Sequence, residues 1–125
     1  MQDCIFVKDG RQKYQIFFSE LQYVESAHRY VKFVTAYGSF LREGSLCDAE
    51  KELPANQFCR IHRNHIISFR YSRQMDPKNV YVAGRQLPIG KQYRGSFLSK
   101  IAMTYNNTMP EKNAGDDLTN QSDPK

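Results

Sequence analysis

The chain has 125 residues, of which 40% are hydrophobic and 13% aromatic, so it can bury one ordinary core but is too short for two domains of typical size. The net charge of +5 is unevenly placed, because residues 53–105 hold nine Lys/Arg and one acid, whereas residues 1–52 carry net −1 and residues 106–125 net −2. The apolar runs are too short for a membrane span and the N-terminus lacks the layout of a signal peptide, so we expect no membrane contact in this segment.

Residues 1–43 alternate short β-branched and aromatic runs with turn dipeptides, a pattern that predicts a series of strands. Asp9-Gly10 is a hairpin signal after the first run, and Tyr37-Gly38 precedes the last run. A polar step over residues 26–29 separates two further runs. The expected strands are residues 4–8, a strand with Tyr14, Ile16 and Phe18 at period two, and residues 21–25, 30–35 and 40–43.

Residues 45–53 predict a short helix, because Ser45 is followed three residues later by Asp48, a weaker relative of the capping box, and Pro54 closes the segment. Its apolar face would consist of Leu46, Ala49 and Leu53.

A second group of strands is expected after this helix, followed by a final helix. The strands are residues 58–69, broken in the middle, then 80–83 and 86–89, with turns at 76–79 and 83–84. The helical face consists of Tyr93, Phe97, Leu98 and Ile101. The sequence therefore predicts one mainly β domain over residues 1–105, a multi-stranded scaffold with two short helices, and a disordered polar tail over residues 106–125.

The basic half of the chain suits a polyanion such as nucleic acid, and it equally suits a solvated basic face without a partner. Its most basic segment is Phe58–Arg73, which has four arginines, two histidines and no acid. Neighbouring side chains in an extended segment point to opposite faces, so these basic groups cannot all be buried.

Arg63 and Asn64 form a polar step between apolar segments, where a loop or bulge would present side chains outward. The arginine fork suits guanine edges and phosphates, and the asparagine amide suits adenine edges, so both are candidate DNA contacts. Arg60 on the same segment is a further candidate. For His62 we favour a structural role, in which its ring bonds a backbone group inside the sheet.

Two smaller polar clusters are also candidate contacts. Lys91 and Arg94 lie where a strand gives way to the last helix, and a helix start favours phosphate through its free N–H groups and positive dipole end. A solvated helix start is the alternative. His28 and Arg29, between two expected strands, form a third cluster that is weak by itself.

The sequence gives little support to a metal site or an enzyme. Cys4, Cys47 and Cys59 are odd in number and widely spaced, which favours a reducing compartment and therefore the cytoplasm. Cys59, His62 and His65 have zinc-like spacing but lack a second ligand pair, so we expect no metal and no cofactor. No nucleophile elbow, Walker loop or zinc-protease motif is present, and a His62/His65 acid–base pair is the one enzymatic alternative left open.

Several motifs, taken in order, closely resemble LytTR domains over about residues 4–102. The combination of Arg-x-His-Arg at residues 60–63 with Leu-Pro-x-x-Lys-x-Tyr at residues 87–93 is fairly specific, whereas either motif alone would be weak. The other matching segments are residues 21–26, 30–32, 44–46, 52–54 and 58–59.

The resemblance implies a LytTR-like, mainly β output domain of a bacterial response regulator in a two-component system. Family members bind promoter DNA as a pair on direct repeats, insert loop residues into successive major grooves, and usually follow a receiver or sensor domain, which these 125 residues lack. Carried over, the contacts would be His28 or Arg29, then Arg63, then Lys91. Asn64 stands where the family usually has serine and Ser68 where asparagine is common, which puts the base preference in doubt.

Two other functions remain open at this stage. A β-scaffold with tyrosine and phenylalanine could stack the bases of RNA or of single-stranded nucleic acid. A β-module that binds a protein partner and no nucleic acid is the third possibility.

Overall fold

The computed structural model describes residues 2–107, without the side chains of residues 103–107. The described chain divides into a first unit that ends at Arg94 and a second that begins at Gly95. The predicted tail lies outside the described residues from residue 108 onward, whereas residues 106 and 107 belong to a helix. Residues 106 and 107, which the prediction assigned to the tail, thus belong to the helix, and the disorder of residues 108–125 stays a prediction.

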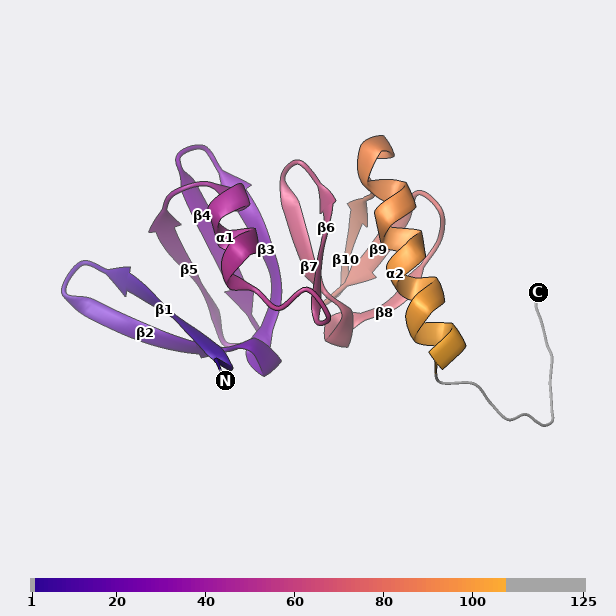
Figure 1. The fold of residues 1–125 in the computed structure, drawn as a ribbon. Coiled ribbons are helices and arrows are strands. Elements are labelled where there is room, and N and C mark those ends of the chain that lie inside the picture. Colours follow the sequence, from indigo (N-terminus) through magenta and orange to yellow (C-terminus); the bar gives the residue numbers. More distant parts are fainter. Residues whose placement is uncertain (1, 108–125) are drawn as a thin grey trace. The chain divides into compact units, whose positions relative to one another are not determined.

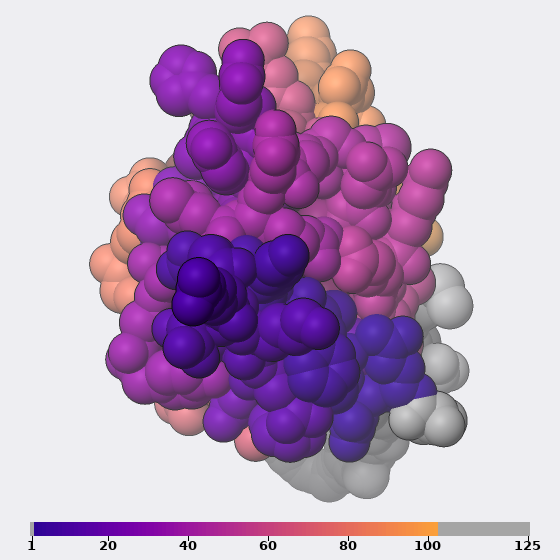
Figure 2. All heavy atoms as spheres, turned by 90° about the vertical axis from the view of Figure 1, so that its left-hand side faces the viewer, coloured from indigo at the N-terminus to yellow at the C-terminus, as the bar shows by residue number. Residues whose placement is uncertain are grey.

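The first unit opens with a two-stranded hairpin, β1 (Cys4–Asp9) and β2 (Gln12–Phe17), which Figure 2 shows in indigo on the surface. Gly10 turns the hairpin with a positive φ of 66°, a conformation that glycine adopts without strain. Ile16 and Phe18 are buried as the period-two pattern predicts, but Tyr14 is 38% exposed and packs its ring 5.0 Å from that of Phe40. Phe18 itself begins a short 3-10 turn, η1 (Phe18–Glu20).

The central sheet has five strands in the order β5-β4-β3-β7-β6, with all neighbours antiparallel (Figure 1). The break expected within residues 58–69 is a tight hairpin turn at Arg63-Asn64 between the last two strands. The strands are β3 (Leu21–Ala27), β4 (Tyr30–Thr35), β5 (Gly38–Glu43), β6 (Phe58–His62) and β7 (His65–Ser68).

Both faces of this sheet are buried where β3 pairs with β7. Tyr23 pairs with Ile67 and Val24 pairs with Ile66, and all four are buried although successive residues of a strand point to opposite faces. One face belongs to the main core and is covered by α1 (Leu46–Glu52), which contributes the predicted residues Leu46 and Ala49, and the predicted Leu53 follows directly after the helix. Ser45 caps this helix, since its hydroxyl accepts a hydrogen bond from the Asp48 amide at 3.1 Å.

A second, three-stranded sheet has the order β10-β9-β8. The turn before β9 is closed by Asp76, whose Oδ1 accepts from the amides of Lys78 and Asn79 at 2.8 and 2.9 Å. A 3-10 turn, η2 (Phe69–Tyr71), leads into this sheet. The strands are β8 (Ser72–Met75), β9 (Asn79–Val82) and β10 (Arg85–Pro88); the first of them was not predicted.

Another 3-10 turn, η3 (Lys91–Tyr93), leads to α2 (Arg94–Asn107), the second predicted helix. The mainly β fold with two short helices is thereby confirmed. Within the described residues, no helix combines the length and the apolar character needed to cross a bilayer.

Candidate nucleic-acid interface

The three basic clusters lie at the same end of the first unit. His28 and Arg29 form the tip of the β3–β4 hairpin, and Arg63 and Asn64 form the tip of the β6–β7 hairpin. The two tips are neighbours because β3 pairs with β7, and beyond that pairing the Ser26 amide donates to the Asn64 carbonyl at 3.0 Å. Figure 1 shows both tips along the upper edge of the ribbon.

The third cluster reaches the same place through a backbone hydrogen bond. The Gly90 amide donates to the Ile61 carbonyl at 2.6 Å, which fixes the segment 90–94 beside β6. A Cβ at position 90 would lie only 3.1 Å from Cδ2 of Tyr93 in the same segment, so glycine leaves room for the Tyr93 ring. Residues of the segment and of the hairpin line a shallow hollow of about 350 Å³: His62, Arg63, Gly90, Lys91, Gln92 and Tyr93.

Arg60 holds the β6–β7 tip from within. Its Nε donates to the His62 carbonyl at 3.0 Å and its Nη2 donates to the Arg63 carbonyl at 2.8 Å. Its Nη1 bonds the Glu50 carboxylate on α1 at 3.3 Å, and the guanidinium lies 5.6 Å from the centre of the Tyr93 ring. With a side chain only 16% exposed, Arg60 is bound by the protein itself and is poorly placed to reach a ligand.

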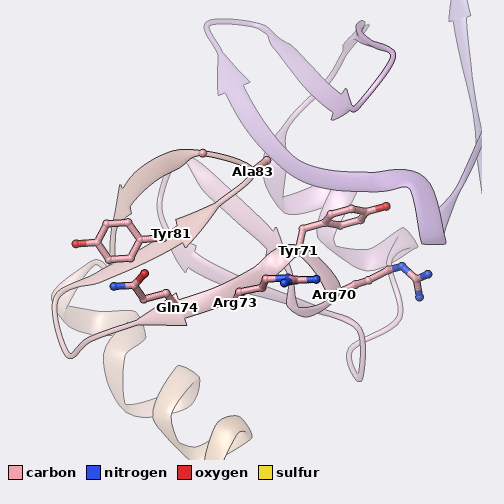
Figure 3. A pocket seen from close by; sticks show the side chains of 7 residues that line it. Arg70, Tyr71, Arg73, Gln74, Tyr81 and Ala83 are labelled. Atoms are coloured by element: carbon pink, nitrogen blue, oxygen red, sulfur yellow. The ribbon is translucent and has the colours of Figure 1, made fainter.

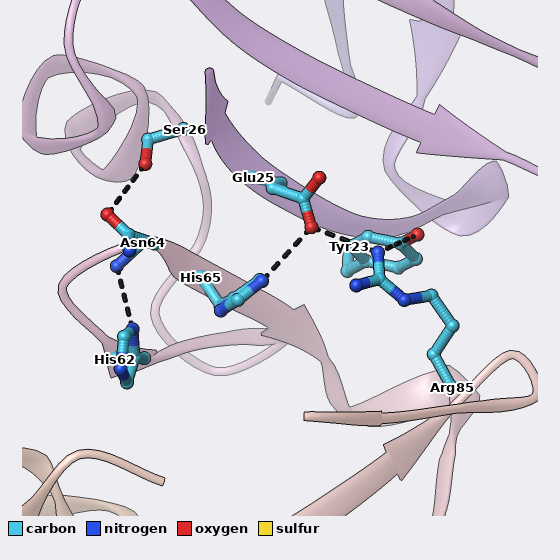
Figure 4. Close-up of polar contacts among 7 residues, drawn as sticks. All are labelled: Tyr23, Glu25, Ser26, His62, Asn64, His65 and Arg85. Carbon is cyan, nitrogen blue, oxygen red and sulfur yellow. Dashed lines mark hydrogen bonds and ion pairs between the residues drawn. The ribbon is translucent and has the colours of Figure 1, made fainter. Parts of the chain in front are cut away.

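Asn64 joins the two hairpin tips (Figure 4). Its Oδ1 accepts a hydrogen bond from Ser26 Oγ at 2.8 Å, and its backbone amide donates to His62 Nδ1 at 3.1 Å. The bond predicted for His62, from its ring to a backbone group, is present, but its partner lies in the hairpin turn and not inside the sheet. Ser68, the other departure from the family pattern, is buried, and its carbonyl accepts from the Ser72 hydroxyl at 2.6 Å.

The β3–β4 tip has an unusual backbone. His28 adopts a φ of 61°, in the left-handed region that only a few per cent of non-glycine residues occupy, His, Asn and Asp more often than the others. The Arg29 carbonyl accepts from the Gly44 amide at 3.0 Å, which ties the tip to the end of β5. Both side chains are exposed. A histidine that keeps a strained position while its ring faces solvent is a candidate for function.

The cations at the tips have no partner in the part of the chain that the structure describes. Arg29, Arg63 and Lys91 are exposed and make no ion pair or side-chain hydrogen bond there. Arg94 is half-buried, and its Nε is buried without a hydrogen-bond partner among these residues. Unpaired cations grouped at one end of a domain produce a positive potential that attracts phosphate.

Sequence reasoning missed a charged cluster behind the tips. Glu25 Oε1 accepts from Arg85 Nη1 at 2.9 Å and lies 3.0 Å from His65 Nε2, while Arg85 Nη1 also donates to Tyr23 Oη at 2.8 Å (Figure 4). Arg85 belongs to β10, so the cluster links the second sheet to the central one. The partners are 40 and 60 residues from Glu25 in sequence, so no local pattern could have identified them.

Burial and charge shift the pKa values within this cluster. Desolvation lowers the pKa of His65 below its ordinary value of 6.5, and the attraction of Glu25 only partly opposes that shift. Burial by itself would raise the pKa of Glu25, but the hydrogen bonds and charges of Arg85 and His65 outweigh it, so this pKa is lowered. Hydrogen bonds to Tyr23 and Glu25 raise the pKa of Arg85.

The residues with zinc-like spacing do not form a recognisable site in the described part of the chain. Cys59 is buried and its Sγ donates to the Arg60 carbonyl at 3.6 Å, and no group of three or more potential metal ligands occurs among these residues. The expectation that no metal or cofactor is needed stays a prediction.

Comparison with known proteins places this arrangement in a family context. A family model described as the LytTr DNA-binding domain matches residues 11–102. Among solved structures, the fold is similar to the LytTr DNA-binding domain of a Bacillus cereus protein described as a methyl-accepting/DNA response regulator. That match has a TM-score of 0.72 and 19% sequence identity, and covers 81% of this chain and 98% of the other. No curated protein matches the chain.

Proposed function

The chain belongs to the LytTR family of DNA-binding domains, and on that basis we propose that it binds duplex DNA sequence-specifically as the output domain of a bacterial transcriptional regulator. The wider setting is a cytoplasmic response regulator of a two-component system, with a receiver or sensor domain on another segment. Two copies of the domain would occupy direct repeats in a promoter. The domain binds and positions DNA and performs no chemical reaction.

The observation that carries this proposal is the state of Arg63. Its backbone carbonyl is held by Arg60, and its neighbour Asn64 is held by Ser26 and His62. Its guanidinium nevertheless has no partner among residues 2–107. Because the backbone is held in place and the N–H donors of the guanidinium are free, Arg63 is preorganised for a ligand that supplies hydrogen-bond acceptors. The edge of a guanine base supplies two such acceptors, which match two N–H groups of one guanidinium.

The geometry supports a division of work among the tips. Arg63, with Asn64 beside it, and Lys91 face the same hollow and are proposed to read base edges. Arg94, where α2 begins, is proposed to bind phosphate, because its charge adds to the positive end of the helix dipole. His28 and Arg29 form a separate tip, suited to a neighbouring part of the duplex. Arg60 was a candidate contact, and we now assign it to positioning the tip.

Single-stranded nucleic acid fits the surface less well. Stacking of unpaired bases requires exposed aromatic rings at the binding surface. Among the aromatic side chains at the tips, Tyr30 is 43% exposed, whereas Tyr93 is half-buried and its ring lies 5.6 Å from the Arg60 guanidinium. Phe6, Tyr14, Phe17 and Tyr37 lie on β1, β2 and the β4–β5 turn instead. The observations therefore favour a duplex.

The decisive test is selection from a random duplex library at near-physiological salt, followed by competition between duplex and matched single strands. We expect recovery of a repeated motif and a clear preference for the duplex. Preference for single strands would replace the proposal with the alternative function. The absence of salt-dependent binding to any nucleic acid would support a protein-binding module instead.

A further inference from the structure

A second hollow of about 660 Å³ lies away from the three tips. Ser72 pairs with Val82, which brings η2 and the start of β8 beside the β9–β10 turn. No residue of the three tips contributes to this hollow. Its lining consists of Arg70, Tyr71, Arg73, Gln74, Tyr81, Ala83 and Gly84 (Figure 3).

A β-bulge directs two consecutive side chains toward this hollow. Ser72 pairs with Val82, and the next pair along the strands is Gln74 with Tyr81, so Arg73 has no partner opposite it. In a regular strand Arg73 and Gln74 would point to opposite faces, whereas here both are exposed and line the hollow. Bulges that re-aim a side chain in this way are common next to functional sites.

The charge of the hollow is entirely positive. Arg70 and Arg73 are exposed, and neither guanidinium has a hydrogen bond or ion pair within the described residues. No acidic residue is among those that line the hollow. Two unneutralised guanidinium groups on one concave surface suit an anion with several acceptor oxygens, and phosphate matches the arginine fork.

The remaining lining suits a planar group attached to that anion. Tyr71 is fixed by its hydroxyl, which donates to the Ser19 carbonyl at 2.6 Å, and Tyr81 lies beside Gln74 on the paired strand. Figure 3 shows Tyr81 and Gln74 at one end of the hollow, Tyr71 and Arg70 at the other, and Arg73 between them. Tyrosine rings can stack on a heterocycle, and a glutamine amide offers both a donor and an acceptor to its edge.

We propose that this hollow is a binding site for a nucleotide, with Arg70 and Arg73 on the phosphate and Tyr81 against the base. Its volume lies in the range of small-molecule sites, about 300–1,000 Å³. A rigid duplex bound across the tips would not enter it, so the site is separate from the proposed DNA interface. A free mononucleotide and the phosphorylated end of a single strand present the same chemistry to this site.

Titration calorimetry of the full chain tests the proposal with four probes: AMP, adenosine, inorganic phosphate and a 5′-phosphorylated single-stranded tetranucleotide. We expect AMP to bind at least about tenfold more tightly than adenosine or phosphate alone, because base and phosphate are both recognised. Comparison of AMP with the tetranucleotide distinguishes a free nucleotide from a strand end. Failure of all four probes to bind at millimolar concentration would overturn the proposal.

Matched variants distinguish binding at this hollow from a general effect of the positive charge of the protein. Arg70→Gln with Arg73→Gln should weaken AMP binding about tenfold or more. Arg11→Gln with Lys13→Gln removes the same charge from the exposed β1–β2 hairpin and should leave AMP binding unchanged. Equal weakening by both pairs would overturn the proposal, as would tighter binding of an acidic peptide than of AMP.

Two further variants complete the test. Tyr81→Leu should weaken AMP binding without changing the response to inorganic phosphate, which identifies a ring contact. Arg63→Ala should leave AMP binding intact, so a failure of the proposed DNA function can be told apart from a failure of this site. Thermal melts of every variant confirm that the fold is retained.

Discussion

The guanidinium of Arg60 donates from Nη2 to the backbone carbonyl of Arg63 at 2.8 Å, so one arginine holds the backbone from which another projects. A second hydrogen bond, from Nε to the His62 carbonyl at 3.0 Å, uses the neighbouring prong of the same planar fork. The two arginines lie three residues apart and have the same charge, yet the side chain of Arg60 is mostly buried and Arg63 is exposed. The difference follows from the hairpin, because Arg60 lies on β6 and Arg63 lies in the turn itself.

Arg60→Lys tests this positioning role, because lysine keeps the charge but cannot reproduce the fork. We expect the free energy of unfolding in urea to fall by about 1–3 kcal/mol as the tip loses hydrogen bonds to a charged donor. Specific DNA binding should weaken while its dependence on salt stays the same. Arg11→Lys on an exposed turn is the control. Unchanged stability together with equal weakening of binding to the selected and random duplexes would show that Arg60 contacts DNA directly.

Arg63→Ala should cost about 1–3 kcal/mol of binding free energy on the selected site and much less on random DNA, because a bidentate contact discriminates between bases. Fluorescence anisotropy with both duplexes measures the difference. The fold should be unaffected, since the Arg63 side chain is exposed. Equal losses on the two duplexes would assign Arg63 to phosphate, and no loss on either would remove it from the interface.

His28→Gly relieves backbone strain and removes a proposed contact at once. A non-glycine residue in the left-handed conformation costs about 1–2 kcal/mol of stability, and glycine removes this strain. Glycine also makes the unfolded chain more flexible, which offsets part of the gain. We therefore expect unchanged or slightly higher stability and weaker specific DNA binding. Ala83→Gly is the matched control, because Ala83 also has a positive φ, of 49°, but lies away from the tips. If His28→Gly binds DNA as well as the unaltered protein, the histidine serves the turn alone.

Local patterns predicted most of the elements. The hairpin at Asp9-Gly10, the capped helix after Ser45 and the break at Arg63-Asn64 were all visible, because each depends on residues within a few positions of one another. Strand β8 was missed, since Ser72 is its one fully buried residue and the bulge at Arg73 removes the alternation that would mark a strand. Its pairing with β9 stabilises it.

The contacts of the individual side chains at the candidate interface were harder to predict than the three clusters themselves. Charge and motif order selected the three clusters, but the sequence did not separate Arg60 from Arg63, because both are arginines on one basic segment. The separation depends on Glu50 and Tyr93, which reach Arg60 from other elements. The link between Ser26 and Asn64 spans 38 residues and was likewise invisible.

Lys91→Ala and Arg94→Ala should have different effects on the salt dependence of DNA binding. Lys91 is exposed and faces the hollow beside Arg63, so its loss should weaken the selected site more than random DNA. Arg94 lies at the start of α2, so its loss should weaken both equally and lower the salt slope by about one. Titrations at several salt concentrations measure both quantities. The reverse pattern would exchange the two assignments.

The stability of the domain should fall as the pH decreases through the range just below 6.5, because of His65. Desolvation lowers the pKa of this half-buried histidine, so the unfolded chain binds a proton that the folded protein resists. The contribution is complete above pH 6.5 and is lost as the pH falls toward the lowered value. Glu25 stays ionised in this range because its pKa is also lowered. Urea unfolding at pH 7.5 and 5.5 measures the loss.

Two variants assign the effect to this cluster. His65→Gln can still donate a hydrogen bond to Glu25 but cannot take up a proton, so the loss of stability between pH 7.5 and 5.5 should become smaller. Glu25→Gln removes the carboxylate that partly supports protonation of His65, so the pKa of His65 should fall further and the loss should become steeper. If His65→Gln retains the full pH dependence of the unaltered protein, a group outside the cluster is responsible.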